Sequence, residues 1–297
     1  MALFLTLPLV AQEDLMGLLD EMEEKTHDYS YAAFKTVRIV NGHSIEIPAP
    51  GVLQMLISHR FGRVNTGIYD LFGLDQANMR MGFEYGLSPH LCVGIGRSNI
   101  GKTYDSFLKI KLLRQQTGKR NIPITLAGVS SIQASMLKWA DLDRVNYFTS
   151  RLSYSHQLLI ARKFSDRFSF QLMPTMVHRN LVATTAEDND VFAVGAGARY
   201  KLSGSVTLNA EYYYLLPSYT ADTYENSLSI GVDIETGGHV FQLLFTNSLG
   251  MTENQYVANT DGRWENGDIH FGFNLARVFT VSDQHNKAPK GESEKAW

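Results

Sequence analysis

The chain has a single cysteine, Cys92, so it can form no intrachain disulfide and no cluster of thiolate metal ligands. It also lacks an excess of basic residues, since 27 Lys and Arg stand against 30 Asp and Glu. The formal charge of −3 argues against nucleic acid as the main partner, because phosphate binding depends on basic surface. No stretch approaches the ~18 consecutive apolar residues that a membrane-spanning helix requires. The composition, with 8 prolines and 44% hydrophobic residues, is nevertheless that of a folded protein.

The first residues have the character of an export signal. Ala2–Val10 form a short apolar run that ends in Ala11-Gln12, although the basic region that usually precedes such a run is missing. We predict that residues 1–11 are a residual signal peptide, with a buried N-terminal strand as the alternative. An exported chain without a membrane helix is either soluble in the periplasm or a membrane β-barrel.

A two-residue period distinguishes these possibilities. From Ala77 to Leu87 the odd positions carry Ala, Met, Phe, Tyr and Leu, whereas the even positions carry Asn, Arg, Gly and Glu. The alternation from Phe148 to Phe164 lasts seventeen residues, well beyond the ~5–6 residues of an ordinary soluble strand. A tilted strand that crosses a bilayer needs ~9–11 residues and often continues beyond it. The period therefore favours membrane-spanning strands.

Twelve such segments can be counted. The alternation recurs in Arg167–Arg179, Val191–Leu202, Ser205–Leu216, Asn226–Glu235 and Gly267–Phe279. Less regular strands lie near 52–62, 91–97, 102–113, 122–134 and 239–248. Short connections lie at Ser88–His90, Gln115–Asn121, Ser165–Asp166, Ser203–Gly204 and Thr236–Gly238. Longer ones lie between them at 63–76, 136–146, 180–189, 217–224 and 249–266, with 98–101 as the exception.

An even strand count, alternating short and long connections, and a closing strand near the C-terminus are typical of membrane barrels. Lipid offers no hydrogen-bond partner, so a sheet that spans it must close on itself. We predict an all-β fold: a single antiparallel transmembrane β-barrel of about 12 strands over residues 51–280. It has short periplasmic turns and longer extracellular loops, in the outer membrane of a Gram-negative bacterium. A soluble sandwich, which also alternates, is the alternative.

Nine segments carry a resemblance to a known family. They are GVLQMLISHRF, FGLDQANMRMGFEYGLS, KLLRQ, LKWADLDRVNYFTSRLSY, QLLIARKFSDR, LMPTMVHRNLV, LNAEYYYLLP, GVDIETGGHVFQLLFTNS and GDIHFGFNLARVF. Together they resemble an outer-membrane β-barrel family of Bacteroidota, a domain of unknown function, from near Tyr31 to Phe279. Asp233–Asn247 and Gly267–Phe279 are the most distinctive. The resemblance implies an outer-membrane location and one barrel domain, and it implies no activity.

The segments outside the barrel suggest partners. Residues 12–50 are expected to be a periplasmic extension, in which the acidic Gln12–Ser30 has leucines at helical spacing. That helix could meet a periplasmic protein or block the barrel mouth; a solvated leader is the alternative. Tyr31–Pro48 could fold inward as a plug or run beneath the barrel. The last strand ends at Phe279, as in signals recognised by barrel-assembly machinery, and residues 281–297 are expected to be a disordered tail.

Charged residues opposite the apolar stripes are expected to line the lumen. They are Arg80, Glu84, Asp105, Lys109, Lys111, Arg151, Arg199, Lys201, Glu211, Asp233, Glu235 and Asp268. A twelve-stranded barrel is intermediate between filled eight-stranded barrels and water-filled porins. We expect these charges to fill the lumen in part and to leave a narrow polar passage or binding site, with a lean towards anionic solutes. A structural barrel that serves a periplasmic partner is a second hypothesis.

A lipid-modifying enzyme is a third hypothesis. His156 and His178 fall on apolar faces, and if Phe164 pairs with Phe168, His178 lies opposite Tyr154. The nearest serine in the same phase, Ser150, lies on the order of 13 Å from Tyr154. That separation is beyond hydrogen-bond reach, so we assign no catalytic residue. Two histidines alone are weak evidence for a metal, and we expect no cofactor.

Overall fold

The computed structural model describes residues 27–139, 141–143 and 145–282. Twelve of its strands form one closed antiparallel barrel, which confirms the predicted fold. They are β2 (Val52–Arg63), β3 (Ala77–Ser88), β4 (Leu91–Ser98), β5 (Thr103–Leu113), β7 (Thr125–Ser135), β8 (Leu152–Lys163), β9 (Phe168–Arg179), β10 (Asp190–Lys201), β11 (Val206–Leu215), β12 (Ser227–Thr236), β13 (His239–Thr246) and β14 (His270–Thr280). Each strand pairs with its neighbours in sequence, and β14 closes the barrel on β2.

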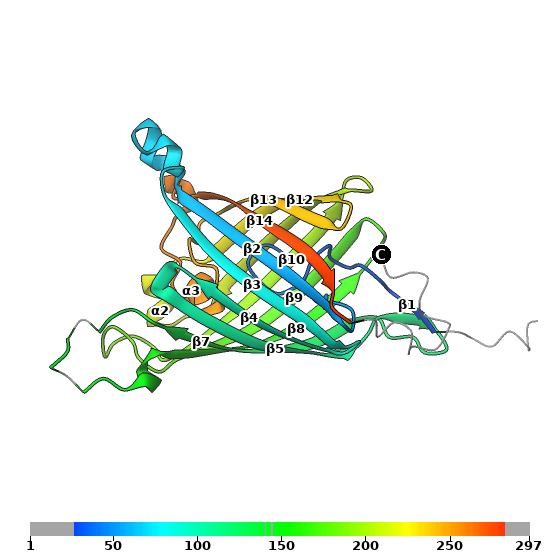
Figure 1. Cartoon of the computed structure of the whole chain (residues 1–297), viewed down its shortest axis with the longest axis horizontal. Coiled ribbons are helices and arrows are strands. Elements are labelled where there is room, and N and C mark those ends of the chain that lie inside the picture. The colour runs from blue at the N-terminus through cyan, green and yellow to red at the C-terminus, as the bar shows by residue number, and fades with distance from the viewer. Residues whose placement is uncertain (1–26, 140, 144, 283–297) are drawn as a thin grey trace, which may run out of the picture.

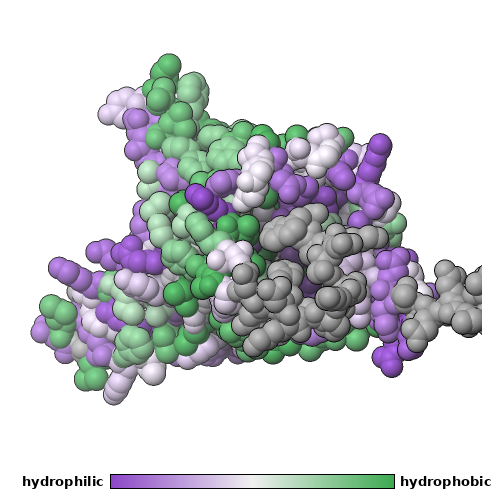
Figure 2. Space-filling view, turned by 45° about the vertical axis from the view of Figure 1, so that its right-hand side comes forward, coloured by the Kyte–Doolittle hydropathy of each residue, from purple (hydrophilic) through white to green (hydrophobic). Residues whose placement is uncertain are grey.

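The two-residue period sets the two faces of the wall. In β8 every second residue from Ser153 to Ala161 is buried toward the lumen, and the residues between them face outward. The outward set across the barrel includes Phe192, Tyr214 and Phe245, each nearly half exposed. Hydrophobic side chains cover much of the wall in Figure 2, and hydrophilic ones gather toward the two ends. This is the distribution that a lipid-facing wall requires.

The predicted strand over Phe148–Phe164 is wrong at its start. Phe148–Arg151 form a single 3₁₀ turn, η3, and β8 begins only at Leu152. The expected turn at Gln115–Asn121 also contains a short strand, β6 (Gln116–Gly118), which pairs with β1 (His27–Tyr29). This two-stranded ribbon projects from the end of the barrel that carries the short turns (Figure 1).

The other elements lie in the longer connections at the opposite end of the barrel (Figure 1). They are η1 (Val64–Gly73), η2 (Ile100–Lys102), α2 (Tyr219–Thr223), α3 (Glu253–Ala258) and η4 (Trp264–Asn266). Membrane barrels have short periplasmic turns and longer extracellular loops, so this end is extracellular and the end with β1 is periplasmic. Among the described residues, no helix is long and apolar enough to cross a membrane.

Residues 30–50, here called the plug, enter the barrel from the periplasmic end (Figure 1). The sequence left open whether Tyr31–Pro48 folds inward, and the structure shows that it does. A tight hairpin forms the tip, in which the Ile39 amide donates to the Gly42 carbonyl at 2.9 Å and Arg38 bridges His43. Residues 37–45 are all buried.

From the extracellular end, residues 249–262, here called the inward loop, fold into the same space. α3 contributes Tyr256, Val257 and Ala258, which are fully buried. The plug and the inward loop therefore fill the lumen from its two ends. The helix expected within residues 12–30 and most of the predicted tail lie outside the described residues.

Candidate functional site

The wall holds the plug tip through a buried carboxylate. Glu211, on the lumenal face of β11, accepts hydrogen bonds from the backbone amides of Val40, Asn41 and Gly42 at 3.2, 3.2 and 2.9 Å. Three amides that converge on one carboxylate satisfy its charge without a cation. Glycine is required at this turn, because a Cβ on Gly42 would lie 2.2 Å from the Tyr213 hydroxyl.

Basic residues of the wall hold the other polar groups of the plug. Lys109 Nζ donates to the carbonyls of Val37, Ser44 and Glu46 at 3.0–3.3 Å. Arg199 Nη1 donates to the carbonyls of two further plug residues, Ala32 and Ala33. Lys109 and Arg199, which sequence reasoning placed in the lumen, thus bind the plug backbone instead of lining an open passage.

The plug meets the inward loop at an ion-paired junction. Arg38 Nη1 lies 3.1 Å from Glu253 Oε1, and its Nε lies 3.5 Å from Glu84 Oε1 on β3. His43 Nε2 lies 3.2 Å from the same Glu253 oxygen. Arg38, His43 and Glu253 are 5%, 0% and 3% exposed, so this level of the lumen is closed to solutes in the present conformation. A periplasmic segment and an extracellular loop are therefore in direct contact.

The lumenal face is also less polar than expected. Leu159 of β8, Met173 of β9 and Tyr213 of β11 point inward and are completely buried. They belong to one core with Ile39 of the plug and Tyr256 of the inward loop. Burying a large apolar side chain stabilises by ~1.5–3 kcal/mol, so these contacts add to the polar ones. Apolar residues on the polar face were the signal in the sequence that the lumen is filled.

Most of the remaining predicted charges pair on the wall or near its ends. Arg80 Nε donates to Asp105 Oδ1 at 3.0 Å, and Asp233 accepts from Thr207 at 3.2 Å and from Gln242. Glu235 forms an ion pair with Lys35 of the plug. Asp268 pairs with Arg63 at the extracellular end, while Lys111 and Lys201 are half-buried toward the periplasmic end.

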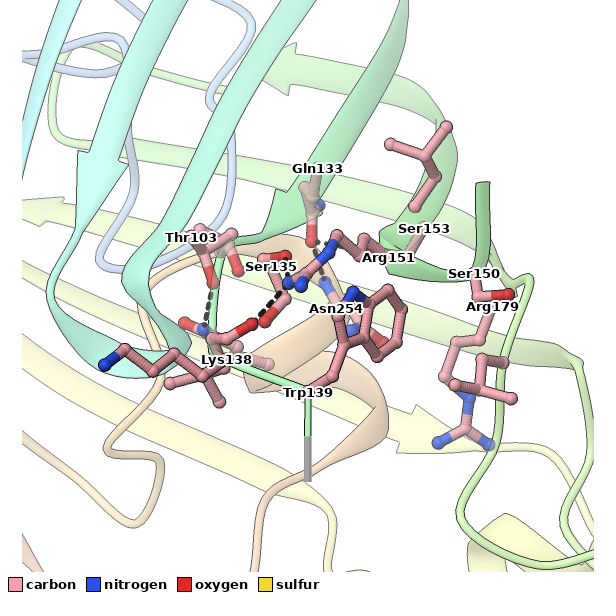
Figure 3. Close-up of a pocket in the computed structure, with 15 residues that line it drawn as sticks. Thr103, Gln133, Ser135, Lys138, Trp139, Ser150, Arg151, Ser153, Arg179 and Asn254 are labelled. Carbon is pink, nitrogen blue, oxygen red and sulfur yellow. Dashed lines mark hydrogen bonds between the residues drawn. The ribbon is translucent and has the colours of Figure 1, made fainter. Parts of the chain in front are cut away.

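A cavity of about 270 Å³ lies above the junction at the extracellular end (Figure 3). Its walls come from the ends of β5, β7, β8 and β9, from residues 137–139, and from the inward loop. Polar lining groups include Gln133, Ser135, Ser153, Asn254 and Gln255. Thr252 and Asn254 line it on either side of Glu253, which turns away toward the plug. The cavity floor is therefore part of the segment that contacts the plug.

The charge of this cavity is of one sign. Lys138, Arg151 and Arg179 line it, and its lining contains no Asp or Glu. The Arg151 guanidinium lies 3.9 Å from the Trp139 ring centroid and donates to the Ser135 carbonyl at 2.9 Å. Arg179 is 3.7 Å from Glu187, whereas no carboxylate of the described residues lies within 4.0 Å of Lys138 or Arg151. Figure 3 shows Arg151 and Trp139 between Lys138 and Arg179.

Sequence reasoning found only part of this cavity. Arg151 was expected in the lumen, but it lies on η3 at the extracellular rim. Lys138, Trp139 and Arg179 were missed. The first two lie in an irregular connection that has no period, and Arg179 lies at the end of β9, where the strand leaves the bilayer.

A smaller cavity of about 50 Å³ lies at the periplasmic end, between the plug and the wall. Lys111, Arg114 and Lys163 line it together with Glu46. The Arg114 guanidinium lies between the rings of Tyr29 and Tyr31, 4.3 and 4.4 Å from their centroids. The two cavities are separated by the buried junction of plug and inward loop.

The histidines on the outer wall lie where the register predicts. Tyr154 pairs with His178, and Phe164 pairs with Phe168 across the turn. His178 Nδ1 is 2.7 Å from Asp190 Oδ1. Within the described part of the chain, neither His156 nor His178 hydrogen-bonds a hydroxyl group. The same residues contain no group of three His, Cys, Asp or Glu side chains that could hold a metal ion.

Comparison with known families shows which family the chain belongs to. Residues 34–279 match the model of a family described as a membrane-bound β-barrel domain, DUF5777. The chain belongs to this family. The match covers every strand of the barrel and most of the plug, so the plug is part of the family's domain. Together with the closed barrel and its apolar wall, it makes the chain an outer-membrane β-barrel protein.

Solved structures with a similar fold are distant. The NanC porin is 10% identical with a TM-score of 0.48, covering 77% of this chain and 98% of its own. An outer-membrane channel from Pseudomonas putida F1 is 12% identical with a TM-score of 0.46, covering 79% and 97%. Outer membrane phospholipase A from Escherichia coli is 12% identical with a TM-score of 0.46, covering 84% and 98%. No curated protein sequence matches the chain.

Proposed function

We propose that this barrel captures small organic anions in its extracellular cavity and admits them to the periplasm when the plug is displaced. The observation that carries the proposal is the cavity lining, which has three basic side chains and no acidic one. A cation that is not already paired is available to a ligand carboxylate or phosphate, and charge-assisted hydrogen bonds are about twice as strong as neutral ones.

The geometry also favours a ligand that carries both an anionic group and hydroxyl groups. The Arg151 guanidinium stacks on the Trp139 ring, and this stacking holds the cation in the cavity lining. The amide groups of Gln133, Asn254 and Gln255 supply neutral donors and acceptors for hydroxyl groups. Carboxylated or phosphorylated sugars have this combination of groups.

Passage requires movement of the plug, because the junction is closed in the present conformation. The inward loop connects the two events. Thr252 and Asn254 line the cavity, while Glu253 between them binds Arg38 of the plug. A ligand that shifts the cavity floor therefore also strains the contact that holds the plug.

Calorimetric titration of the purified, folded barrel tests the binding step. Glucuronate and glucose 6-phosphate are expected to bind, whereas neutral glucose is not. Arg151→Gln should weaken anion binding about tenfold or more, as expected for the loss of a charge-assisted hydrogen bond. Arg263→Gln is the matched control, because Arg263 is also extracellular but pairs with Glu225 outside the cavity. Equal affinity for glucose, or an unchanged affinity in Arg151→Gln, would contradict the proposal.

A periplasmic partner is a second candidate function. The β1–β6 ribbon projects beyond the barrel, and β1 has no second strand partner among the described residues. Such an edge can add a strand from another protein. Co-purification of a partner that is lost when residues 13–30 are deleted would support this function. Phe279, 38% exposed at the end of β14, is the group we assign to recognition by barrel-assembly machinery.

Lipid hydrolysis has weaker support. The hydrogen bond from His178 to Asp190 resembles two members of a catalytic triad, but a triad also needs a nucleophile within hydrogen-bond reach of the imidazole. We therefore expect phospholipase assays of the wild type and of His178→Ala to give the same background rate. Hydrolysis by the wild type that disappears in the variant would establish an enzyme.

A further inference from the structure

The outer wall has an apolar groove of about 700 Å³ in its extracellular half. Two small outward residues, Ser106 of β5 and Ala134 of β7, lie among larger neighbours. The strand register places Ser106 between Ile95 and Ile132, and Ala134 between Tyr104 and Leu152. Ile95 is 62% exposed, so it stands out from the wall. The two small residues therefore leave an open apolar groove between larger side chains, in which a hydrocarbon chain can lie.

A cation lies at the upper end of this groove. Arg97 faces outward near the end of β4, with its guanidinium 5.4 Å from the centroid of the Tyr104 ring. No carboxylate of the described residues lies within 4.0 Å of Arg97. The side chain lies at the level where the apolar wall meets the extracellular loops, which is the depth of lipid head groups. An unpaired cation at that depth attracts an anionic head group.

We propose that the groove is a binding site for one anionic lipid. The acyl chain lies over Ser106 and Ala134, and the negatively charged head group binds Arg97. Charge complementarity distinguishes this site from the rest of the wall. The outward Arg162 and Arg277 also stack on aromatic rings, but they lie at the periplasmic ends of β8 and β14 and outside the groove.

Native mass spectrometry of the full-length barrel, released from detergent, tests the site. The probes are phosphatidylglycerol, which is anionic, and phosphatidylcholine with the same acyl chains, which is zwitterionic. The wild type is expected to retain one phosphatidylglycerol molecule. Arg97→Gln should reduce this retention about fivefold, the effect of one basic residue at a membrane surface. Ala134→Trp, which fills the groove, should reduce it at least as much.

Arg162→Gln is the control, because it removes the same charge from a similar aromatic stack outside the groove. Each variant is first shown to be folded by its resistance to unfolding in cold detergent. The proposal is overturned if Arg97→Gln retains as much phosphatidylglycerol as the wild type. It is also overturned if Arg162→Gln loses as much as Arg97→Gln, or if phosphatidylcholine is retained equally well.

Discussion

Replacing Glu253 with glutamine tests whether the junction keeps the lumen closed. Arg38 and Glu253 are almost completely buried and their charged atoms are 3.1 Å apart. Removing one partner of a buried ion pair destabilises by ~3–5 kcal/mol. We use the lower end, about 3 kcal/mol, because Glu84 remains 3.5 Å from Arg38 and keeps part of its charge compensated.

This loss of stability affects the docking of the plug and leaves the barrel wall intact, because the strand ladder is complete without the plug. Each ~1.4 kcal/mol changes an equilibrium constant tenfold. The population of displaced plug should therefore rise on the order of 100-fold in Glu253→Gln. Lumenal groups that are buried in the wild type become accessible to solvent in that population.

The single cysteine provides the measurement. Cys92 is fully buried on the lumenal face of β4, so a water-soluble maleimide reaches it only after the lumen opens. Labelling should be about 100-fold faster in Glu253→Gln than in the wild type, and channel openings in planar bilayers should be correspondingly more frequent. Glu265→Gln, an exposed change in the same extracellular connection, is the control. Unchanged labelling and unchanged openings in Glu253→Gln would refute the role of the junction.

Two other changes of the plug have expected outcomes. Gly42→Ala places a methyl group against the wall at the plug tip, so Cys92 labelling should be faster, while the folded barrel still resists cold detergent. Burial, reinforced by the charge of Arg38, holds the pKa of His43 well below its usual value of 6.5. The displaced plug therefore binds a proton that the docked plug does not, and acidification from about pH 7.5 to about pH 5.5 should speed Cys92 labelling. His43→Gln should remove this pH dependence, and a dependence that persists in the variant would contradict the assignment.

The barrel could be predicted from the sequence because membrane and lumen impose opposite demands on alternate residues. The pairing of Tyr154 with His178 follows once Phe164 is paired with Phe168 across the turn of residues 165–167. Strand starts were less certain. Phe148 and Ser150 keep the alternation of β8 but lie in η3, because a side-chain pattern does not record where backbone pairing ends.

The extracellular cavity could not be predicted in the same way. Lys138 and Trp139 lie in a connection whose conformation depends on contacts with the inward loop and with the ends of three strands. Arg151 could be predicted to face the lumen because it continues the two-residue alternation of β8 on the lumenal side. Periodicity places a residue on a face of the wall, and it carries no information about loops that fold over the end of the barrel.

Charge complementarity also could not identify the segment that fills the lumen. The wall carries both signs, and a plug with matching charges would be the simplest expectation. Instead Glu211 binds backbone amides of the plug, and Lys109 binds backbone carbonyls. Every segment has such groups, so these contacts leave no mark on the plug sequence. The basic side chains Lys35, Arg38 and His43 are the exceptions, since each lies within 4.0 Å of a carboxylate. The information that the lumen is filled therefore lies in the wall. Leu159 and Met173 interrupt its polar face, and a lumen filled only with water would not require apolar residues there.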